Sequence, residues 1–392
     1  MISTEASPFA KVGGLAEAIP PLARALAELG HDLRLVLPRY YFIDRSQLED
    51  CGILGTVPFE GQRLPLRAFR GTLPDSAIPV YFVEAEEFFG RDGVYGTLEE
   101  KEFPDNARRF AFFCRACFAL CRAIGWIPDI VHSHDWPAGP AMAFLDIDES
   151  HDGFEHSRGV FTIHNIAYQG LFPAEQFRVL DLGAEQFSPG SFEFFGRLNF
   201  MQGAIRHCQA ITTVSPGYAG EITTNRFGFG LEGILQERRS DLQGILNGLD
   251  YRIWNPRTDP LLAAPFDHDD LAGKAQCKQA LQELTTLDVR PDCPLVGIVS
   301  RLVSQKGFFE LLSPGGLPRL MAERDVQVVV LGSGEAWCEN GLYRLAAKYP
   351  KRLAFHGEYH ADHAHRVTAG SDFLLMPSLL EPCGLSQMAA LR

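Results

Sequence analysis

The fold class is decided by one stretch near the end of the chain, FLLMPSLLEPCGL at residues 373–385. Its apolar first part predicts a buried strand, which ends in a loop and leads into a new helix. Open α/β sheets bind ligands outside the carboxyl ends of their strands. Glu381 is therefore predicted to lie where such proteins carry out chemistry, and Gly384 lets the backbone approach a ligand closely. The alternative is an ordinary helix start with an acidic residue.

The same alternation of strands and helices extends backwards from this stretch through the chain. Short apolar runs predict strands at residues 33–37, 80–83, 130–132, 160–163, 210–214, 296–299, 326–331, 353–355 and 373–376. Amphipathic segments predict helices at residues 106–124, 136–145 and 192–207, and helices that begin at Leu15, Phe308, Glu335 and Ala361. This order favours parallel sheets with helices on both faces.

A turn-rich segment at residues 247–257 separates two such series. The length of 392 residues is sufficient for two domains. We therefore expect an α/β protein with two Rossmann-like parallel-sheet domains, residues 1–245 and 246–392. Two such domains imply a cleft between them, and interdomain clefts are favoured ligand sites.

The overall composition argues against several classes of function. The chain has 36 basic and 49 acidic residues and a formal charge of -13, so a basic face for nucleic acid is not expected. No apolar run reaches the length of a membrane span, and no leader sequence opens the chain. Nine cysteines are scattered without a paired metal-binding spacing, which is typical of core residues in a reducing compartment. These features predict a cytoplasmic protein without a membrane or nucleic-acid partner, a metal or a cofactor.

The loop before the first helix is a candidate anion site. Gly13 and Gly14 at a helix start expose backbone N–H groups and the positive end of the helix dipole. Lys11 adds a mobile positive charge to the same loop. Glycine turns before helices are common, so this pattern alone is only a moderate indication.

A dinucleotide-binding fold is the alternative for such a loop. It would require an acidic residue at the end of the next strand to bind the ribose hydroxyl. The predicted strand at residues 33–37 ends in Pro38-Arg39-Tyr40 instead. The chain contains a G-x-G-x-x-G at residues 228–233, but this segment follows no predicted strand and is typical of a loop that opens a helix.

Two further loops at strand ends carry polar side chains. The first reads HSHDW at residues 132–136, and its Asp135 is predicted to face the cleft as a hydrogen-bond acceptor for a polyol. The second reads FTIHNIAYQG at residues 161–170, where His164 lies among polar groups and an aromatic ring that suit contact with a sugar. Alternatives remain for both loops. The two histidines and the aspartate of the first could bind a metal, and His164 could be a core histidine.

A pair of cations follows the first strand of the second series. Arg301 lies directly after this strand, and Lys306 lies at the start of the next helix. Two cations at this place can hold a diphosphate through charge-assisted hydrogen bonds, each contributing roughly 1.5–3 kcal/mol. Solvation of both side chains at the surface is the alternative.

Together these segments resemble the glycogen/starch synthase family, which are retaining glucosyltransferases of the two-domain GT-B type. The shared motifs are K-x-G-G-L at residues 11–15, H-x-H-D-W at 132–136, F-T-x-H-N-x-A-Y-Q-G at 161–170, T-V-S-P at 213–216, L-N-G-L-D at 246–250, S-R-L and Q-K-G within 300–307, and E-P-C-G-L at 381–385. They cover essentially the whole chain in the family's order, so the resemblance is far more specific than any single motif.

The resemblance implies a reaction and a set of roles. The family transfers glucose from ADP-glucose, or from UDP-glucose in some relatives, to the non-reducing end of an α-1,4-glucan such as glycogen or starch. The implied catalytic residues are Glu381, which holds the glucose hydroxyls, and His164 and Asp135, which line the glucose and acceptor side. The implied substrate-binding residues are Lys11, Gly13, Gly14, Asn247, Arg301, Lys306, Cys383, Gly384 and Leu385. The implied location is a cytoplasm of the bacterial type, with a plastid as the alternative.

The chain departs from the family pattern at three places. Ala16-Glu17 stands where the family has Ala-Asp. Only Met1-Ile2 remain of the strand before the first loop, and the chain stops at Arg392, before a further phosphate-binding loop and a final helix. We therefore expect a chain truncated at both ends, with an incomplete second domain. A second hypothesis is accordingly an inactive, non-catalytic glucan- or nucleotide-binding remnant. A third, a sucrose- or trehalose-type synthase of the same fold, is disfavoured by the spacing of H-N-x-A-Y-Q-G.

Overall fold

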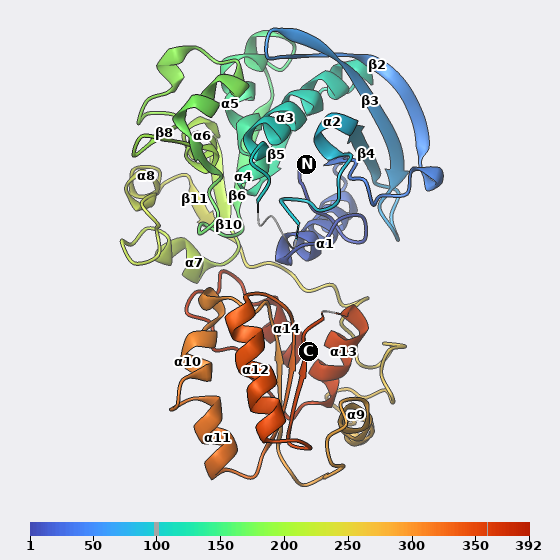
Figure 1. The fold of residues 1–392 in the computed structure, drawn as a ribbon. Helices are drawn as coiled ribbons and strands as arrows, with labels where there is room; N and C mark the ends of the chain where they lie inside the picture. The colour runs from blue at the N-terminus through green and yellow to red at the C-terminus, as the bar shows by residue number, and fades with distance from the viewer. Residues whose placement is uncertain (98–101, 359) are drawn as a thin grey trace. The chain divides into compact units, whose positions relative to one another are not determined.

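The computed structural model describes residues 1–97, 102–358 and 360–392. Within them the chain forms two compact units, Met1–Gly248 and Leu249–Arg392, which we call unit 1 and unit 2. Each unit contains a sheet with parallel strands covered by helices, so the predicted α/β class is confirmed (Figure 1). No helix among these residues is long and apolar enough to cross a membrane.

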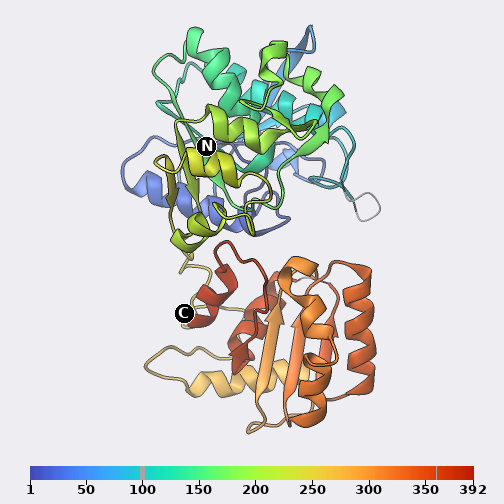
Figure 2. The ribbon, with the colours of Figure 1, turned by 90° about the vertical axis from the view of Figure 1, so that its left-hand side faces the viewer.

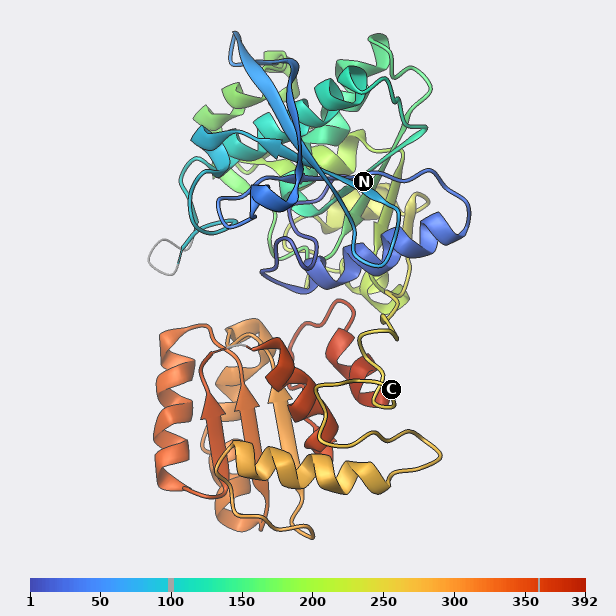
Figure 3. The same cartoon turned by 90° about the vertical axis from the view of Figure 1, so that its right-hand side faces the viewer.

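Unit 1 contains two groups of four strands. One group has the order β1-β4-β3-β2, with β1 at Leu35–Pro38, β4 at Pro79–Glu84, β3 at Gln62–Thr72 and β2 at Glu49–Phe59. The other has the order β11-β10-β6-β5, with β5 at Ile130–His134, β6 at Arg158–Ile163, β10 at Ala210–Thr213 and β11 at Leu242–Gly244. The second group and the β1–β4 pair are parallel, as predicted. The antiparallel β2–β3 hairpin, which projects at one edge of the unit in Figure 3, was not predicted.

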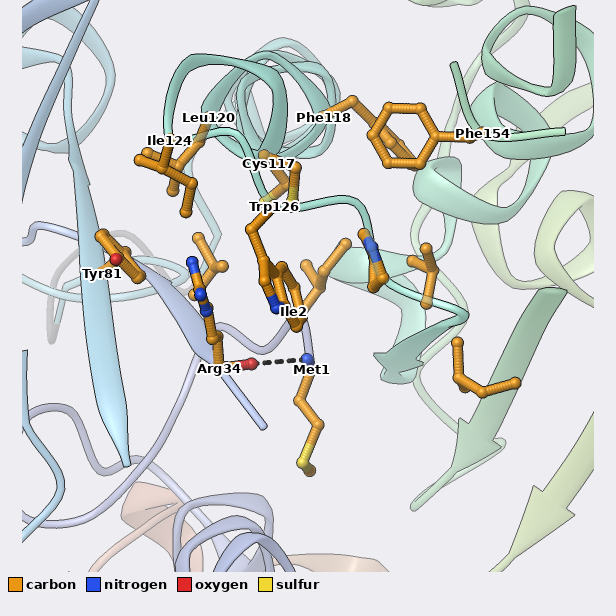
Figure 4. A pocket seen from close by; sticks show the side chains of 15 residues that line it. Met1, Ile2, Arg34, Tyr81, Cys117, Phe118, Leu120, Ile124, Trp126 and Phe154 are labelled. Carbon is orange, nitrogen blue, oxygen red and sulfur yellow. Dashed lines mark hydrogen bonds between the residues drawn. The ribbon is translucent and has the colours of Figure 1, made fainter. Parts of the chain in front are cut away.

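The first residues of the chain join these two groups of strands. Ile2 forms parallel bridges with both Ser133 of β5 and Val36 of β1. The Met1 ammonium donates to the carbonyl oxygen of Arg34 at 2.8 Å (Figure 4). Because these pairings are parallel, the loop after Ile2 leaves the sheet at the carboxyl ends of β1 and β5. Ligands of α/β sheets bind at this edge.

The helices of unit 1 cover the sheet. They are α1 (Gly14–Glu28), α2 (Glu86–Phe89), α3 (Asn106–Ala123), α4 (Asp135–Ala138), α5 (Pro140–Ile147), α6 (Phe200–His207), α7 (Pro216–Glu221) and α8 (Glu232–Glu237), with short 3-10 helices at Arg45–Gln47, Glu149–His151, Ala174–Leu180 and Ala184–Gln186. The helix predicted at residues 136–145 is divided into α4 and α5. Pro140 lacks the N–H that would continue α4 and instead begins α5.

The helix predicted at residues 192–207 begins only at Phe200, so its first half is wrong. That half belongs to a small antiparallel sheet of order β7-β9-β8, with β7 at Leu171–Pro173, β9 at Arg197–Asn199 and β8 at Glu193–Phe194. Phe195 and Gly196 have φ values of 49° and 77° and form the turn between β8 and β9, which interrupts any helix. The Asn199 side chain then accepts from the N–H of Gln202 and caps α6.

Unit 2 is a parallel sheet of order β14-β13-β12-β15 between two layers of helices (Figures 1 and 2). Its strands are β12 (Leu295–Val299), β13 (Gln327–Leu331), β14 (Leu353–His356) and β15 (Phe373–Leu374). Its helices are α9 (Ala272–Leu284), α10 (Phe308–Leu312), α11 (Leu317–Glu323), α12 (Ala336–Lys348), α13 (Ala361–Gly370) and α14 (Leu385–Leu391). Val328 and Val330 of β13 pack with residues of α10–α12, whereas Val329 and Leu331 pack with residues of α9 and α13. Both faces of the sheet are therefore buried, which explains the continuous apolar strands in the sequence.

Candidate functional site

The loops after β5 and β6 are joined by the carboxylate of Asp135. Its Oδ1 accepts from the backbone N–H of His164 at 2.7 Å and from that of Asn165 at 3.3 Å. Asp135 itself has φ of 57°, in the left-handed region that aspartate and asparagine tolerate better than most residues. The structure thus brings the predicted residues Asp135 and His164 together. One carboxylate oxygen anchors the backbone, and Oδ2 has no hydrogen-bond partner among the described residues.

Three histidine rings lie side by side at this edge of the unit 1 sheet. The rings of His132 and His134 have centroids 4.1 Å apart, and Nδ1 of His134 lies 3.1 Å from Nε2 of His164. Nε2 of His132 lies 2.6 Å from the hydroxyl of Thr162. Burial lowers the pKa of His132 and of His164 to about 3, and lowers that of His134 well below its usual value. The rings are therefore neutral near pH 7.

Like the neutral histidines, the carboxyl group of Asp135 is in surroundings that disfavour its charged form. Burial raises the pKa of Asp135 to about 7, and the backbone N–H groups of His164 and Asn165 oppose that rise. The negative charge of Glu5 raises the pKa further. This part of unit 1 is thus a hydrogen-bonding site with little net charge, suited to neutral hydroxyl groups.

The glycine loop is organised by Glu5, which the sequence analysis did not identify. Its Oε2 accepts from the N–H groups of Val12 and Gly13 at 2.6 and 2.8 Å. The hydroxyl of Tyr95 donates to Oε1 of the same carboxylate at 2.7 Å. The N–H of Gly13 is therefore already bound, and an anion at this loop would use the N–H of Gly14 or replace the carboxylate. Glu5 is hard to recognise from the sequence, because the strand that precedes it consists only of a bridge at Ile2.

Lys11 and Asn247 also lie in unit 1. The ammonium of Lys11 is 2.7 Å from Oε1 of Glu17, and Lys11 lines a hollow together with Tyr95 and its neighbours. The N–H of Asn247 donates to the carbonyl of Val214 at 3.3 Å, beyond the carboxyl end of β10. Both residues are thus at the strand-end edge that carries the predicted site of unit 1.

A separate apolar cavity lies between the start of the chain and α3 (Figure 4). Its lining includes Ile2, Cys117, Cys121 and Trp126. None of the predicted site residues lines it. Burial raises the pKa of Cys121 to about 11, so its thiol is protonated and unreactive near pH 7.

In unit 2 the predicted residues Lys306 and Glu381 form an ion pair. The ammonium of Lys306 is 2.6 Å from Oε2 of Glu381, and these side chains are 17% and 25% exposed. The hydroxyl of Ser378 donates to the same oxygen at 2.8 Å. Oε1 of Glu381 has no hydrogen-bond partner among the described residues, so one oxygen of this carboxylate remains for a ligand.

Two backbone contacts hold this ion pair at the end of the sheet. Gly307 follows Lys306 with φ of 74°, and a Cβ at this glycine would lie 1.9 Å from the carbonyl oxygen of Pro377. The N–H of Leu379 donates to the carbonyl of Gln305 at 3.0 Å. The loops after β12 and β15 are therefore locked together, because β15 pairs directly with β12. Arg301 is exposed on the first of these loops, directly after β12.

The predicted residue Leu385 begins α14, and Cys383 and Gly384 directly precede this helix. Gly384 has φ of 81°, which favours glycine at this position. The amide of Gln387 donates to the carbonyl of Cys383 at 3.2 Å. The loop that carries Glu381 thus leads into a short helix, and the side chain of Gln387 in this helix binds back to the end of the loop.

The metal alternative was based on His132, His134 and Asp135. Within the described parts of the chain, the group of three potential ligands close enough to share an ion is Asp267, His268 and Asp269. These three side chains lie on a loop of unit 2, and His268 and Asp269 are exposed. Among the described residues, His132, His134 and Asp135 do not form such a group.

Comparison with known families identifies the family of this chain. The model of the starch synthase catalytic domain matches residues 1–237, which is more than half of the chain. The chain belongs to the starch synthase catalytic domain family. The resemblance found in the sequence motifs is thereby confirmed, and the chain is a glycosyltransferase of the glycogen/starch synthase group.

Relatives of known name support the same assignment over the full chain. Glycogen synthase of Treponema denticola is 43% identical over 100% of this chain and 80% of its own length. Glycogen synthase of Anaeromyxobacter dehalogenans is 44% identical over 100% of this chain and 81% of its own length. The catalytic domain of starch synthase IV from Arabidopsis thaliana, solved with ADP and acarbose, matches with a TM-score of 0.90 and 32% identity, over 100% of this chain and 80% of that one. The predicted fold, of the type shared by these synthases, is thus confirmed.

Proposed function

We propose that this glycogen/starch synthase uses ADP-glucose as donor and extends the non-reducing end of an α-1,4-glucan, with retention of configuration. The observation that carries the proposal is the Lys306–Glu381 pair, which joins the loops after β12 and β15, and Arg301 belongs to the first of these loops. These side chains offer cations for a diphosphate and a carboxylate for sugar hydroxyls. The related starch synthase IV was solved with ADP and acarbose, which supports an adenine nucleotide and a glucan-like ligand.

Unit 2 supplies the leaving-group chemistry in this proposal. Cleavage of the bond between C1 of glucose and the phosphate oxygen leaves negative charge on ADP and positive character on the sugar ring. Arg301 and Lys306 stabilise the phosphate, and each such group contributes on the order of a hundredfold in rate. Glu381 binds glucose hydroxyls through Oε1. Cys383, Gly384 and Leu385 bring backbone groups close to the donor.

Unit 1 supplies the remaining contacts. Lys11, Gly13, Gly14 and Asn247 contact the donor, whereas His164 and Asp135 bind hydroxyl groups of glucose and acceptor. The acceptor hydroxyl attacks C1 on the face that ADP leaves, and its proton passes to the departing phosphate oxygen. This route needs no carboxylate nucleophile, which agrees with Oδ1 of Asp135 being occupied by two backbone N–H groups.

The decisive experiment incubates the chain with ADP-glucose and glycogen and measures ADP release and glucose incorporation. We expect both with ADP-glucose, lower rates with UDP-glucose, and loss of both in Lys306→Ala. Absence of ADP release at any protein concentration would overturn the proposed reaction for this chain. A higher rate with UDP-glucose would overturn the proposed donor.

We also propose a cytoplasmic location. All nine cysteines are free thiols, which is typical of a reducing compartment. Cell fractionation with an antibody against the chain tests this. Recovery in an oxidising compartment would contradict it.

A further inference from the structure

His134 and His164 share one hydrogen bond across the carboxyl ends of β5 and β6. Nδ1 of His134 lies 3.1 Å from Nε2 of His164, with ring centroids 5.3 Å apart. Because burial lowers the pKa of both imidazoles far below 7, both rings are neutral at neutral pH. A neutral imidazole has one N–H donor and one acceptor nitrogen. The pair therefore has two possible arrangements, which differ in the ring that donates.

The second nitrogen of His134 distinguishes these arrangements. Nε2 of His134 is buried and has no hydrogen-bond partner. If His164 donated, His134 would carry its proton on this Nε2, and a buried donor without a partner costs about 1–3 kcal/mol. If His134 donates from Nδ1, its buried Nε2 carries no proton. Buried N–H groups without partners are rarer in proteins than acceptors that lack one, so the second arrangement is favoured.

We propose that His134 is a positioning residue that fixes His164 in the tautomer with its proton on Nδ1. Nδ1–H of His134 donates to Nε2 of His164, and His164 therefore presents Nδ1–H as a donor. Nδ1 of His164 has no hydrogen-bond partner among the described residues, and the side chain is only half-buried. The backbone N–H of His164 is bound to Asp135 Oδ1 at 2.7 Å, so backbone and ring are held independently.

The ligand of this donor rests on the proposed function. A fixed, neutral N–H suits an oxygen of a sugar, either a hydroxyl or the ring oxygen. A phosphate would instead favour the charged donors Arg301 and Lys306, since charge-assisted hydrogen bonds are stronger. A hydroxyl is both donor and acceptor, so Asp135 and His164 together offer complementary groups to hydroxyls of one sugar. His134 thus determines that His164 acts as a hydrogen-bond donor toward the glucose or the acceptor.

The tautomers can be measured directly by two-bond ¹H–¹⁵N correlation spectra of the ¹⁵N-histidine-labelled chain. The chain has 12 histidines, and His164→Gln identifies the signals of His164. We expect protonated Nδ1 and unprotonated Nε2 for His164 in the wild type. The same pattern should persist in His134→Asn, because the Asn side-chain amide places an N–H near the position of Nδ1. In His134→Leu, which has a similar shape without a donor, His164 should shift toward protonated Nε2.

Kinetics provide the second readout. We expect His134→Leu to lower kcat about tenfold to a hundredfold with little change in KM, and His134→Asn to restore most of kcat. Protonated Nε2 on wild-type His164 overturns the proposal, and so does an unchanged tautomer in His134→Leu. If His134→Leu fails to fold, the wild-type and His134→Asn spectra still decide. If the chain releases no ADP at all, the proposed reaction fails, while the tautomer result stands by itself.

Discussion

The two strand-end sites of this chain are built from opposite kinds of interaction. In unit 1, Asp135 and His164 are fixed by backbone hydrogen bonds and neighbouring neutral rings. In unit 2, Lys306 and Glu381 are fixed by their mutual ion pair. If the proposed roles hold, the first arrangement should persist when a neutral sugar binds, because Oδ2 of Asp135 and Nδ1 of His164 are not used in these contacts. The second should rearrange when a diphosphate binds, because the phosphate would compete with Glu381 for Lys306.

This difference fits the two roles proposed for the units. Neutral hydrogen-bonding groups suit recognition of sugar hydroxyls, whereas an ion pair keeps a cation available for a phosphate. The Lys306–Glu381 pair also compensates each of the two charges when no ligand is bound. A buried or half-buried charge without a partner would otherwise be costly.

The largest effect is expected from removal of the cation in unit 2. Lys306→Ala should lower kcat for ADP release a hundredfold or more, because in the proposed reaction the leaving phosphate would lose a cationic donor. Lys306→Arg, which retains the charge, should keep a larger part of the rate. A decrease of less than threefold in Lys306→Ala, with unchanged melting temperature, would show that the ion pair is structural only.

A smaller effect, on stability, is expected from the close backbone contact between the loops after β12 and β15 in unit 2. Gly307→Ala should destabilise the fold by about 1–3 kcal/mol, because its Cβ would lie 1.9 Å from the carbonyl oxygen of Pro377 and its φ is positive. Gly315→Ala is the matched control, since a Cβ there meets nothing within 4 Å. Urea unfolding of both variants measures the difference. Equal midpoints would contradict the close contact.

In unit 1, the stabilising effect of Asp135 should depend more on its acceptor oxygen than on its charge. Asp135→Ala should cost about 1–2 kcal/mol, because the N–H groups of His164 and Asn165 lose their acceptor. Asp135→Asn should cost less, since its amide oxygen can accept from the same groups and asparagine tolerates the positive φ. Thermal unfolding distinguishes the two. Equal losses in the two variants would mean that the charge of Asp135, and not its acceptor oxygen, holds the loops.

The smallest effect near neutral pH is expected from the neutral histidines of unit 1. His132 has a pKa of about 3 in the fold and about 6.5 when unfolded, so unfolding takes up a proton between these values. Stability should therefore fall as the pH drops below 6.5, by about 1.4 kcal/mol per pH unit for each such histidine. Asp135 acts in the opposite sense, because its raised pKa of about 7 makes its contribution disappear as the pH rises through 7.

His132→Gln tests this, because the amide can keep the hydrogen bond to Thr162 without titrating. Its unfolding free energy, measured from pH 6.5 to 4.5, should depend less steeply on pH than that of the wild type. Parallel curves for the two proteins would refute the neutral state of His132. A substitution in unit 2, such as Gly315→Ala, should leave the slope unchanged.

The sequence itself determined the class of fold and the residues that stand at strand ends. Strands such as β4 and β13 and the helix α3 were predictable because a buried parallel strand is an unbroken apolar run and a helix repeats its apolar face every 3.6 residues. His164 was identified because it follows such a strand directly, and Lys306 and Glu381 because they lie in the loops that follow such strands. These patterns are local, so a few neighbouring residues suffice to recognise them.

The tertiary structure alone decided which side chains meet. The ion pair of Lys306 and Glu381 joins residues 75 positions apart, and the anchor of Asp135 joins loops after two different strands. Glu5 was missed because its partners are the backbone N–H groups of Val12 and Gly13 and the distant hydroxyl of Tyr95, which leave no pattern in the sequence. The helix predicted at residues 192–207 was wrong because the turn at Phe195 and Gly196 overrides the local helical periodicity. The periodicity of a sequence shows which face of a segment is buried. Which side chains contact one another is decided only when the folded sheet brings its strand ends together at one edge.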